Sequence, residues 1–253
     1  MVASCDLGIV IERPAYFNYE STGGLNWSGG HNVIGATSPL ETWYFAEGTT
    51  RENPANGYYH QYLCLQNPGD KDARVTITCM PGTGENRTQS VVVGARSRET
   101  VSVNAFLGPD QDVSCRVSST VPIVAERPIY FSTGDGWNDG HNVVGATGPR
   151  RKWLFAEGTT RSGFRQYLCL QNPEEEDASV IITYLLATGD NVTENLMLTA
   201  KSRYTVEVEK SIGPGQDNST AIVSDRGIIA ERPMYFNYGG IWSGGHNVIG
   251  YSP

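Results

Sequence analysis

Three of the four histidines in this chain occupy the same position of a repeated block. His31, His141 and His246 each stand in a Gly-His-Asn-Val segment that ends in glycine. A metal or catalytic centre needs several ligands that converge, such as His, Cys or carboxylates at short spacing. Here each histidine is flanked by Gly and Asn, with no second His and no adjacent Cys. The pattern therefore favours a buried structural imidazole over a ligand contact, a metal site or catalysis, and we expect no cofactor.

Each of these blocks is preceded by a Glu-Arg-Pro triplet. Neighbouring residues of a strand face opposite sides, so one of the two charges must point inward or toward a neighbouring module, where it needs a partner. The two Ala-Glu-Gly-Thr-Thr-Arg blocks supply complementary charges. We predict a network that fixes the angle between consecutive modules, and its members are Glu12, Arg13, His31, Asn32, Glu47, Arg51, Glu126, Arg127, His141, Asn142, Glu157, Arg161, Glu231, Arg232, His246 and Asn247.

Glu47 and Glu126 could also be read as the paired carboxylates of a glycosidase. The repetition argues against this alternative, because enzymes seldom duplicate a catalytic centre in tandem. We therefore expect no catalytic residues.

Trp27, Trp137 and Trp242 each lie just before the Gly-His-Asn block, in a segment rich in Gly, Asn and Ser. Exposed aromatic rings in such a setting can stack on sugars, so these residues are possible ligand contacts. The favoured alternative is that each indole covers the junction between modules. The segment 135–140 also resembles a calcium loop weakly, but Trp137 stands where an oxygen ligand is required and the other copies lack the acidic residues.

The cysteines can be compared between the repeats. Cys64 and Cys169 match, whereas Cys79 and Cys115 are replaced together, by Tyr184 and Thr220. Two cysteines that are lost together suggest a bonded pair, so we predict a Cys79–Cys115 disulfide and, with it, an oxidising compartment.

Composition limits the function further. The chain has 253 residues, with 19 Lys and Arg against 27 Asp and Glu, for a net charge of −8. This balance argues against nucleic acid and against an anionic membrane surface as partners. No apolar run approaches the ~18 residues that a membrane-spanning helix needs. With 29 Gly, 13 Tyr and only 18% charged residues, the composition is typical of a turn-rich β protein.

The repeats define the expected architecture. Corresponding residues, such as Cys64 and Cys169, recur at a spacing of roughly 105 residues, which suits a β-sandwich module. Alternating segments such as 73–79, 98–103, 113–117 and 123–127, separated by turn signals, predict six or seven strands in each module. We predict an all-β chain of two tandem immunoglobulin-like β-sandwich modules. The expected boundaries are a partial module at 1–42, modules at 43–145 and 153–253, and a linker at 146–152.

The partial module carries one apolar strand and a complete Gly-His-Asn block. Alone it cannot bury that strand, so it either packs on the next module of its own chain or pairs with another molecule.

Several segments together resemble a known repeat. They are Trp-Tyr-Phe-Ala-Glu-Gly-Thr-Thr, Tyr-Leu-Cys-Leu-Gln-Asn-Pro, Ala-Arg-Ser-Arg-x-Thr-Val, Val-Ala-Glu-Arg-Pro-x-Tyr-Phe and Gly-His-Asn-Val-Ile-Gly. Nearly the whole chain resembles an uncharacterised tandem repeat of large secreted and cell-surface bacterial proteins. The resemblance implies a repeated β module in an extracellular or cell-surface setting, and it implies no activity.

We therefore expect a non-enzymatic stalk, spacer or filament-forming segment whose partners are neighbouring modules of the same or another copy. One alternative is an adhesin module that binds glycans or a surface through its tryptophans. Another is self-assembly in which the N-terminal strand is donated to a neighbouring molecule.

Overall fold

Strands make up nearly all of the regular structure. The structure is a computed structural model, which describes residue 3 and residues 5–20 and 26–253. Its described helices are α1 (Val103–Leu107) and α2 (Val208–Ile212), each of five residues. The sequence prediction of an all-β, sandwich-type fold is confirmed.

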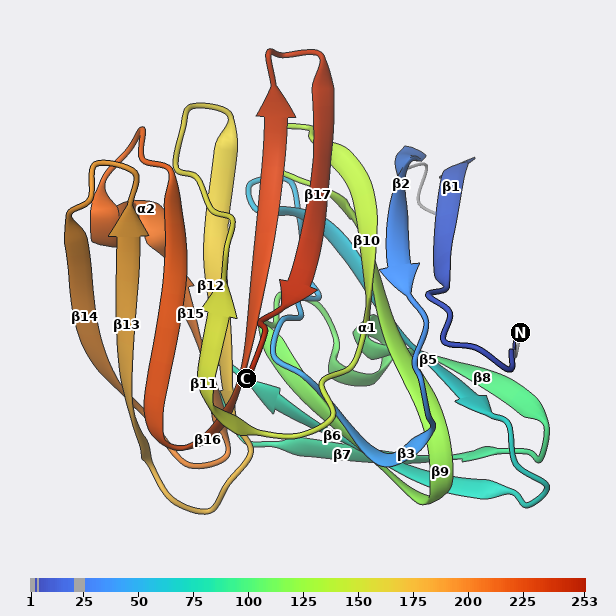
Figure 1. Ribbon diagram of the computed structural model, residues 1–253. Helices are drawn as coiled ribbons and strands as arrows, with labels where there is room; N and C mark the ends of the chain where they lie inside the picture. The colour runs from blue at the N-terminus through green and yellow to red at the C-terminus, as the bar shows by residue number, and fades with distance from the viewer. Residues whose placement is uncertain (1–2, 4, 21–25) are drawn as a thin grey trace.

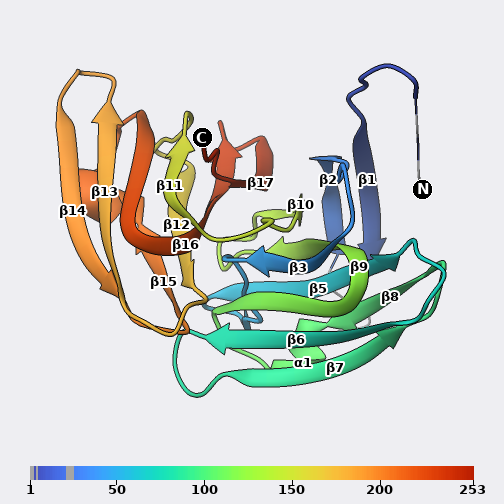
Figure 2. The ribbon, with the colours of Figure 1, turned by 60° about the horizontal axis from the view of Figure 1, so that its bottom comes forward.

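The first module is built around one long strand, β9 (Val113–Ser132). Its first half pairs with β3 (Leu40–Phe45) and β6 (Ala73–Pro81), and β6 also pairs with β7 (Arg87–Val93). Its second half pairs with β5 (Gly57–Asn67) and β10 (Asn138–Val144). The strand thus belongs to both layers of the sandwich, as Figure 2 shows. The remaining strands are β4 (Glu52–Asn53) and β8 (Ser97–Ser102), which both pair with β5.

The second module repeats this topology around β16 (Asn218–Tyr238). One layer contains the first half of β16 and the other contains its second half. The strands that join the first half are β11 (Arg150–Phe155), β13 (Ala178–Leu186) and β14 (Asn191–Leu198). Those that join the second half are β12 (Phe164–Asn172), β15 (Ser202–Glu207) and β17 (Trp242–Ile249).

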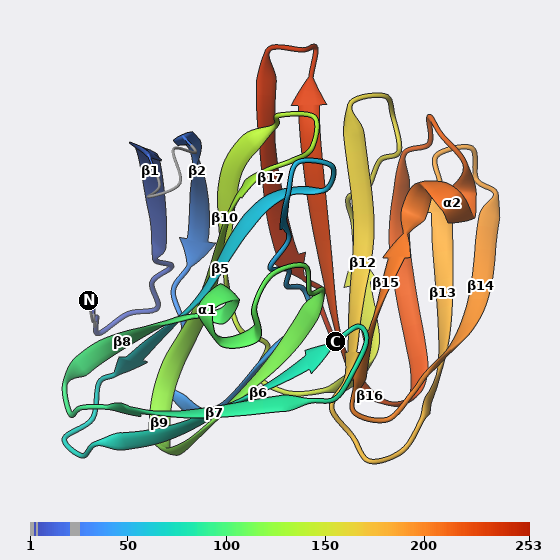
Figure 3. The same ribbon diagram turned by 180° about the vertical axis from the view of Figure 1, so that it is seen from behind.

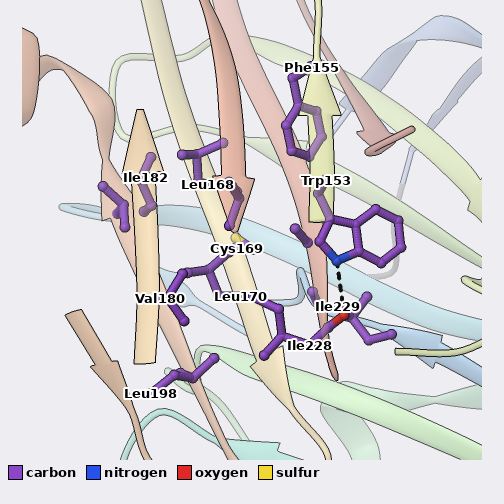
Figure 4. Close-up of a cluster of buried hydrophobic side chains, with 14 of the residues drawn as sticks. Trp153, Phe155, Leu168, Cys169, Leu170, Val180, Ile182, Leu198, Ile228 and Ile229 are labelled. Carbon is purple, nitrogen blue, oxygen red and sulfur yellow. Dashed lines mark hydrogen bonds between the residues drawn. The ribbon is translucent and has the colours of Figure 1, made fainter. Parts of the chain in front are cut away.

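Alternation of apolar and polar residues explains why these segments form half-buried strands. In β5 every second residue is buried, and the same period recurs in β6 and β13. Each module closes over a tryptophan whose indole N–H finds a backbone acceptor. Trp43 donates to the carbonyl of Ile123 at 2.8 Å, and Trp153 donates to that of Ile228 at 2.9 Å. Figure 4 shows Trp153 with its neighbours in the second core.

Three hairpins rise from the sandwiches and lie side by side. Hairpin 1 consists of β1 (Glu12–Glu20) and β2 (Asn26–Ile34). Hairpin 2 consists of residues 126–132 of β9 with β10, and hairpin 3 of residues 231–238 of β16 with β17. Strand β10 lies between β2 and β17, as Figures 1 and 3 show from opposite sides. The partial module therefore packs against the first module of its own chain.

Two expectations about the elements need correction. Strand β10 ends at Val144 and β11 begins at Arg150, so residues 145–149 separate the modules in place of the predicted linker 146–152. The separate strands predicted at 113–117 and 123–127 form one element, β9. Cys79 and Cys115 lie opposite each other on β6 and β9 with their Sγ atoms 2.9 Å apart, and the disulfide between them stays a prediction.

Candidate functional site

The junction between the modules begins at the end of β3. Alternation sends Trp43 and Phe45 into the core of the first module, while Tyr44 and Ala46 point the other way and join the buried cluster of the second module. Glu47 follows directly. The Ala-Glu-Gly block of the first module is thus pressed against the outer face of the second module, which is formed by β12 and β16.

Arg127 lies at the centre of this junction and contacts carboxylates from both modules. Its Nη2 is 2.6 Å from Glu47 Oε2, and its Nη1 is 2.9 Å from Glu231 Oε2. Nη1 also donates to the backbone carbonyl of Glu47. The side chains of Arg127 and Glu231 are 0% exposed and that of Glu47 is 5% exposed. Buried charges persist only when they are paired and hydrogen-bonded in this way.

Three further groups complete the network. The amide N–H of Ala46 donates to Glu231 Oε1 at 2.9 Å, and the hydroxyl of Tyr235 donates to Glu47 Oε1 at 2.9 Å. His141 Nε2 lies 3.5 Å from the same oxygen of Glu47. Both carboxylates are therefore contacted by groups from each module.

These contacts set the charge state of Glu47. Burial alone would raise the pKa of its carboxyl, but His141, Arg127 and the Tyr235 hydroxyl together lower it to about 2. For Arg127, burial would lower the pKa, and the adjacent Glu231 and Glu47 carboxylates outweigh that effect and raise it. The guanidinium and the Glu47 carboxylate are thus both ionised at neutral pH.

One side-chain hydrogen bond recurs within each hairpin. The asparagine of Gly-His-Asn donates through Nδ2 to the glutamate of the facing Glu-Arg-Pro triplet. The pairs are Asn32 with Glu12, Asn142 with Glu126, and Asn247 with Glu231.

A second contact recurs between hairpins: the arginine of one Glu-Arg-Pro triplet forms an ion pair with the glutamate of the next triplet. Arg13 Nη2 lies 2.7 Å from Glu126 Oε2, as Arg127 lies beside Glu231. An aromatic contact also joins hairpin 1 to hairpin 2: the rings of Phe17 and Tyr130 pack edge-on at a centroid distance of 5.0 Å. Consecutive hairpins therefore stack head to tail through one recurring interface.

Asp139 connects all three hairpins, and the sequence analysis missed this role. Its Oδ1 accepts from the amide of Gly30 at 3.1 Å, and its Oδ2 accepts from the amide of Gly245 at 2.9 Å. A Cβ at Gly29 would lie 1.7 Å from Asp139 Oδ1, so a side chain at position 29 would have to displace this carboxylate. The sequence carried a signal for this role, which is a difference between the copies of the block: the first and third copies have Gly29 and Gly244 where the second copy has Asp139.

Some residues of the predicted network lie elsewhere. Arg51 pairs with Asp112 at 2.7 Å, and Arg161 pairs with Asp217, so neither joins the glutamates of the triplets. Arg232 lies 3.2 Å from Glu157, whose side chain is 67% exposed.

The histidines also differ between copies. His141 is 2% exposed within the junction, whereas His246 is 38% exposed and lies 3.9 Å from Glu157. Burial and Arg232 lower the pKa of His246 to about 4. His31 is half-buried in hairpin 1.

The three tryptophans do not share one environment. Trp27 is completely buried, with its ring 4.6 Å from that of His60. Trp137 is half-buried under the guanidinium of Arg165, 4.5 Å from the ring centroid. Trp242 is 62% exposed. A ligand-binding row of three equivalent indoles is therefore not present.

A polar cleft of about 280 Å³ opens beside the junction. Its walls include Tyr59, Tyr167, Arg165, Arg203 and Asp112. Among the described residues, no group of three or more His, Cys, Asp or Glu side chains is placed to hold a metal ion. No helix in the described part of the chain has the length and apolar character needed to cross a membrane.

Comparison with known proteins leaves the family open. No family model matches the chain, and no curated protein matches it. A Thermotoga maritima protein, titled 1070, is 19% identical over 43% of this chain and 94% of its own, with a TM-score of 0.38. The Anabaena sensory rhodopsin transducer is 27% identical over 36% of this chain and 97% of its own, with a TM-score of 0.31. A two-domain fibronectin type III segment of chicken tenascin is 13% identical over 84% of this chain and 98% of its own, with a TM-score of 0.17.

Proposed function

We propose that this chain is a non-enzymatic structural repeat that acts as a stiff spacer in an extracellular or cell-surface protein. The observation that carries the proposal is the buried ion network of the junction, in which Arg127 joins Glu47 of its own module to Glu231 of the next. A flexible tether between independent domains would expose these charges to water. Their burial is suited to holding two modules at one angle.

The recurrence of the contacts supports the same function. Each hairpin offers an arginine to the next and a glutamate to the previous one, so the interface is heterologous and can be repeated without closing on itself. An array built in this way gains length with each module. The extracellular setting rests on the resemblance of the repeat segments to bacterial surface proteins.

Small-angle X-ray scattering in dilute solution tests the spacer function. For the natural chain we expect a profile that one fixed arrangement of the two modules reproduces. For Arg127→Met we expect a profile that requires a range of inter-module angles, because two buried carboxylates then repel each other. Arg161→Met, which removes an exposed charge, serves as the control. A range of angles in the natural chain would overturn the proposal.

A second candidate function is glycan binding at the tip of hairpin 3. Trp242 and Tyr238 are 62% and 57% exposed, with nearly parallel rings whose centroids are 6.2 Å apart. Planar exposed rings of this kind suit stacking on a sugar. Quenching of tryptophan fluorescence by a panel of glycans, abolished by Trp242→Ala, would support it, and the absence of quenching with every glycan would exclude it.

Self-assembly through donation of the N-terminal strand stays a prediction. The apolar strand predicted at 8–13 is not formed as such: residues 8–11 lie outside any strand, with Ile9 52% and Val10 83% exposed. The strand that forms instead is β1, which begins at Glu12 and pairs with β2 of the same chain.

A further inference from the structure

The outer face of the first module carries an open cleft of about 690 Å³ beside hairpin 1. Its walls include Cys64 and Gln66 of β5, Arg98 of β8 and Glu126 of β9. Hairpin 1 contributes Arg13 to its rim.

The corresponding face of the second module is partly covered, with the smaller cleft of about 280 Å³ left beside the junction. The residues equivalent to Cys64, Gln66, Arg98 and Glu126 are Cys169, Gln171, Arg203 and Glu231. Against them lies the Ala-Glu-Gly block of the first module, whose Ala46 amide donates to Glu231. Nearby, Gln171 Nε2 contacts Met80 Sδ at 3.7 Å. The structure thus shows this face with an occupant in the second module and without one in the first module.

The groups that hold the occupant have counterparts at the open cleft. Arg13 pairs with Glu126 just as Arg127 pairs with Glu231, yet the side chain of Arg13 is 54% exposed where that of Arg127 is 0%. His31 takes the place of His141 and is half-buried rather than 2% exposed. The structure pairs this arginine with one carboxylate where Arg127 has two, and the arginine lines the cleft.

We propose that this cleft binds the Ala-Glu-Gly block of another module of the same repeat, with the block's glutamate on Arg13 and the N–H of its alanine on Glu126. The proposal rests on the proposed function, since it takes the repeat to be a stacking unit. It names the partner by its chemistry: an extended segment that ends in Ala-Glu-Gly-Thr-Thr.

Hairpin 1 defines which module fits. It stands against hairpin 2 as hairpin 2 stands against hairpin 3, so it occupies the place of the incoming module's final hairpin. The occupant is therefore the module whose final hairpin is hairpin 1. In a second copy of this chain, the block that contains Glu157 is joined to hairpin 3 through the pair of Glu157 with Arg232. For that block to enter the cleft, hairpin 3 of the second copy would have to displace hairpin 1.

Binding of a peptide to the complete chain tests the proposal. The probe is a labelled, end-blocked peptide with the sequence of residues 44–51, Tyr-Phe-Ala-Glu-Gly-Thr-Thr-Arg, and the matched control has Gln in place of Glu. By fluorescence anisotropy we expect the Gln peptide to bind about tenfold more weakly, because it loses a charge-assisted hydrogen bond. Arg13→Met should remove this discrimination. Arg74→Met, an exposed substitution on β6, should retain it.

Two further readouts locate the peptide. In a Cys5→Ser chain, which removes an exposed thiol, bound peptide should slow the labelling of Cys64, as the junction covers Cys169. Burial and Arg13 lower the pKa of His31, and the arriving carboxylate should raise it in an NMR titration. Equal binding of the two peptides, or no binding at millimolar concentration, would overturn the proposal.

Sedimentation of the complete chain identifies the source of the block. A mass that grows with concentration and returns to the monomer on Glu157→Gln would overturn the assignment to a module completed by hairpin 1, because the block would then come from a second copy. A monomer that binds the Glu peptide would support the site and assign the block to a separate module. The scattering test of the spacer involves no peptide, so the two proposals can fail independently.

Discussion

At the scale of single residues, the junction depends on one guanidinium between two carboxylates. Removing Arg127 leaves Glu47 and Glu231 buried, adjacent and without their cation. We expect Arg127→Met to lower the free energy of unfolding by about 3–5 kcal/mol, as for other broken buried pairs. Urea denaturation followed by circular dichroism measures the loss.

The repeat supplies a matched control for this variant. Arg232 holds the same position in hairpin 3, but its partner Glu157 is 67% exposed, so no buried charge is stranded. Arg232→Met should cost about 1 kcal/mol or less. Equal losses for the two variants would show that the junction does not depend on the buried pairing.

Glu47 makes the junction sensitive to acid. Its pKa is lowered from 4.5 to about 2 in the folded chain, so the unfolded state binds the proton more readily. The stability that this group contributes, about 3 kcal/mol, is present above pH 4.5 and is lost as pH falls toward 2. We expect Glu47→Gln to flatten the fall of unfolding free energy across that window.

The exposed counterpart Glu157→Gln is the control for the acid experiment. If Glu47→Gln and the natural chain lose stability in parallel between pH 4.5 and 2, Glu47 is not the group that titrates.

The residue types of this network could be predicted from sequence, but their partners could not. The need to pair Glu47 and Arg127 follows from opposite charges in repeated apolar strands. The sequence does not indicate which glutamate pairs with which arginine, because the Glu-Arg-Pro triplets of the three copies are nearly identical. Only the folded arrangement places Arg127 against Glu231 of the following module.

At the scale of elements, Asp139 ties β10 to the strands on both sides of it. We expect Asp139→Ala to speed hydrogen exchange at the amides of Gly30 and Gly245, because each loses its acceptor. Exchange measured by NMR tests this directly. Asp135→Ala, in the turn before β10, is the control, and unchanged exchange at both glycines would refute the role assigned to Asp139.

Strand β9 shows why the strands were easier to predict than their connection. The alternating segments at its two ends were recognised, but the polar stretch at Ser118, Ser119 and Thr120 and the proline at 122 are typical of a turn. In the structure the chain stays extended there while it passes from one layer to the other. The register of β3 shifts at the same place, between Leu40 and Thr42.

Sequence reasoning also treated the three tryptophans as equivalent, and the elements around them are not. Trp27 is covered because hairpin 1 packs against β5 and hairpin 2, near His60. Trp242 lies at the tip of hairpin 3 and is 62% exposed. Identical local sequence thus gave different burial, because burial depends on which repeat is the neighbour.

At the scale of the whole molecule, the two modules and hairpin 1 form a stack with one recurring interface. At the internal junction Glu47 is 5% exposed, and at the far end its equivalent Glu157 is 67% exposed. The two ends of the stack therefore carry complementary halves of the contact that holds its middle together. This arrangement suits a protein whose task is to set distance and direction.

The most direct test of the account is ¹⁵N NMR relaxation of the natural chain in dilute solution. If the buried network fixes the junction, amides of both modules report one rotational diffusion tensor, and Arg127→Met separates them into two. Different correlation times for the two modules in the natural chain would contradict the account, because buried pairing of Arg127 with Glu231 does not allow the modules to reorient independently.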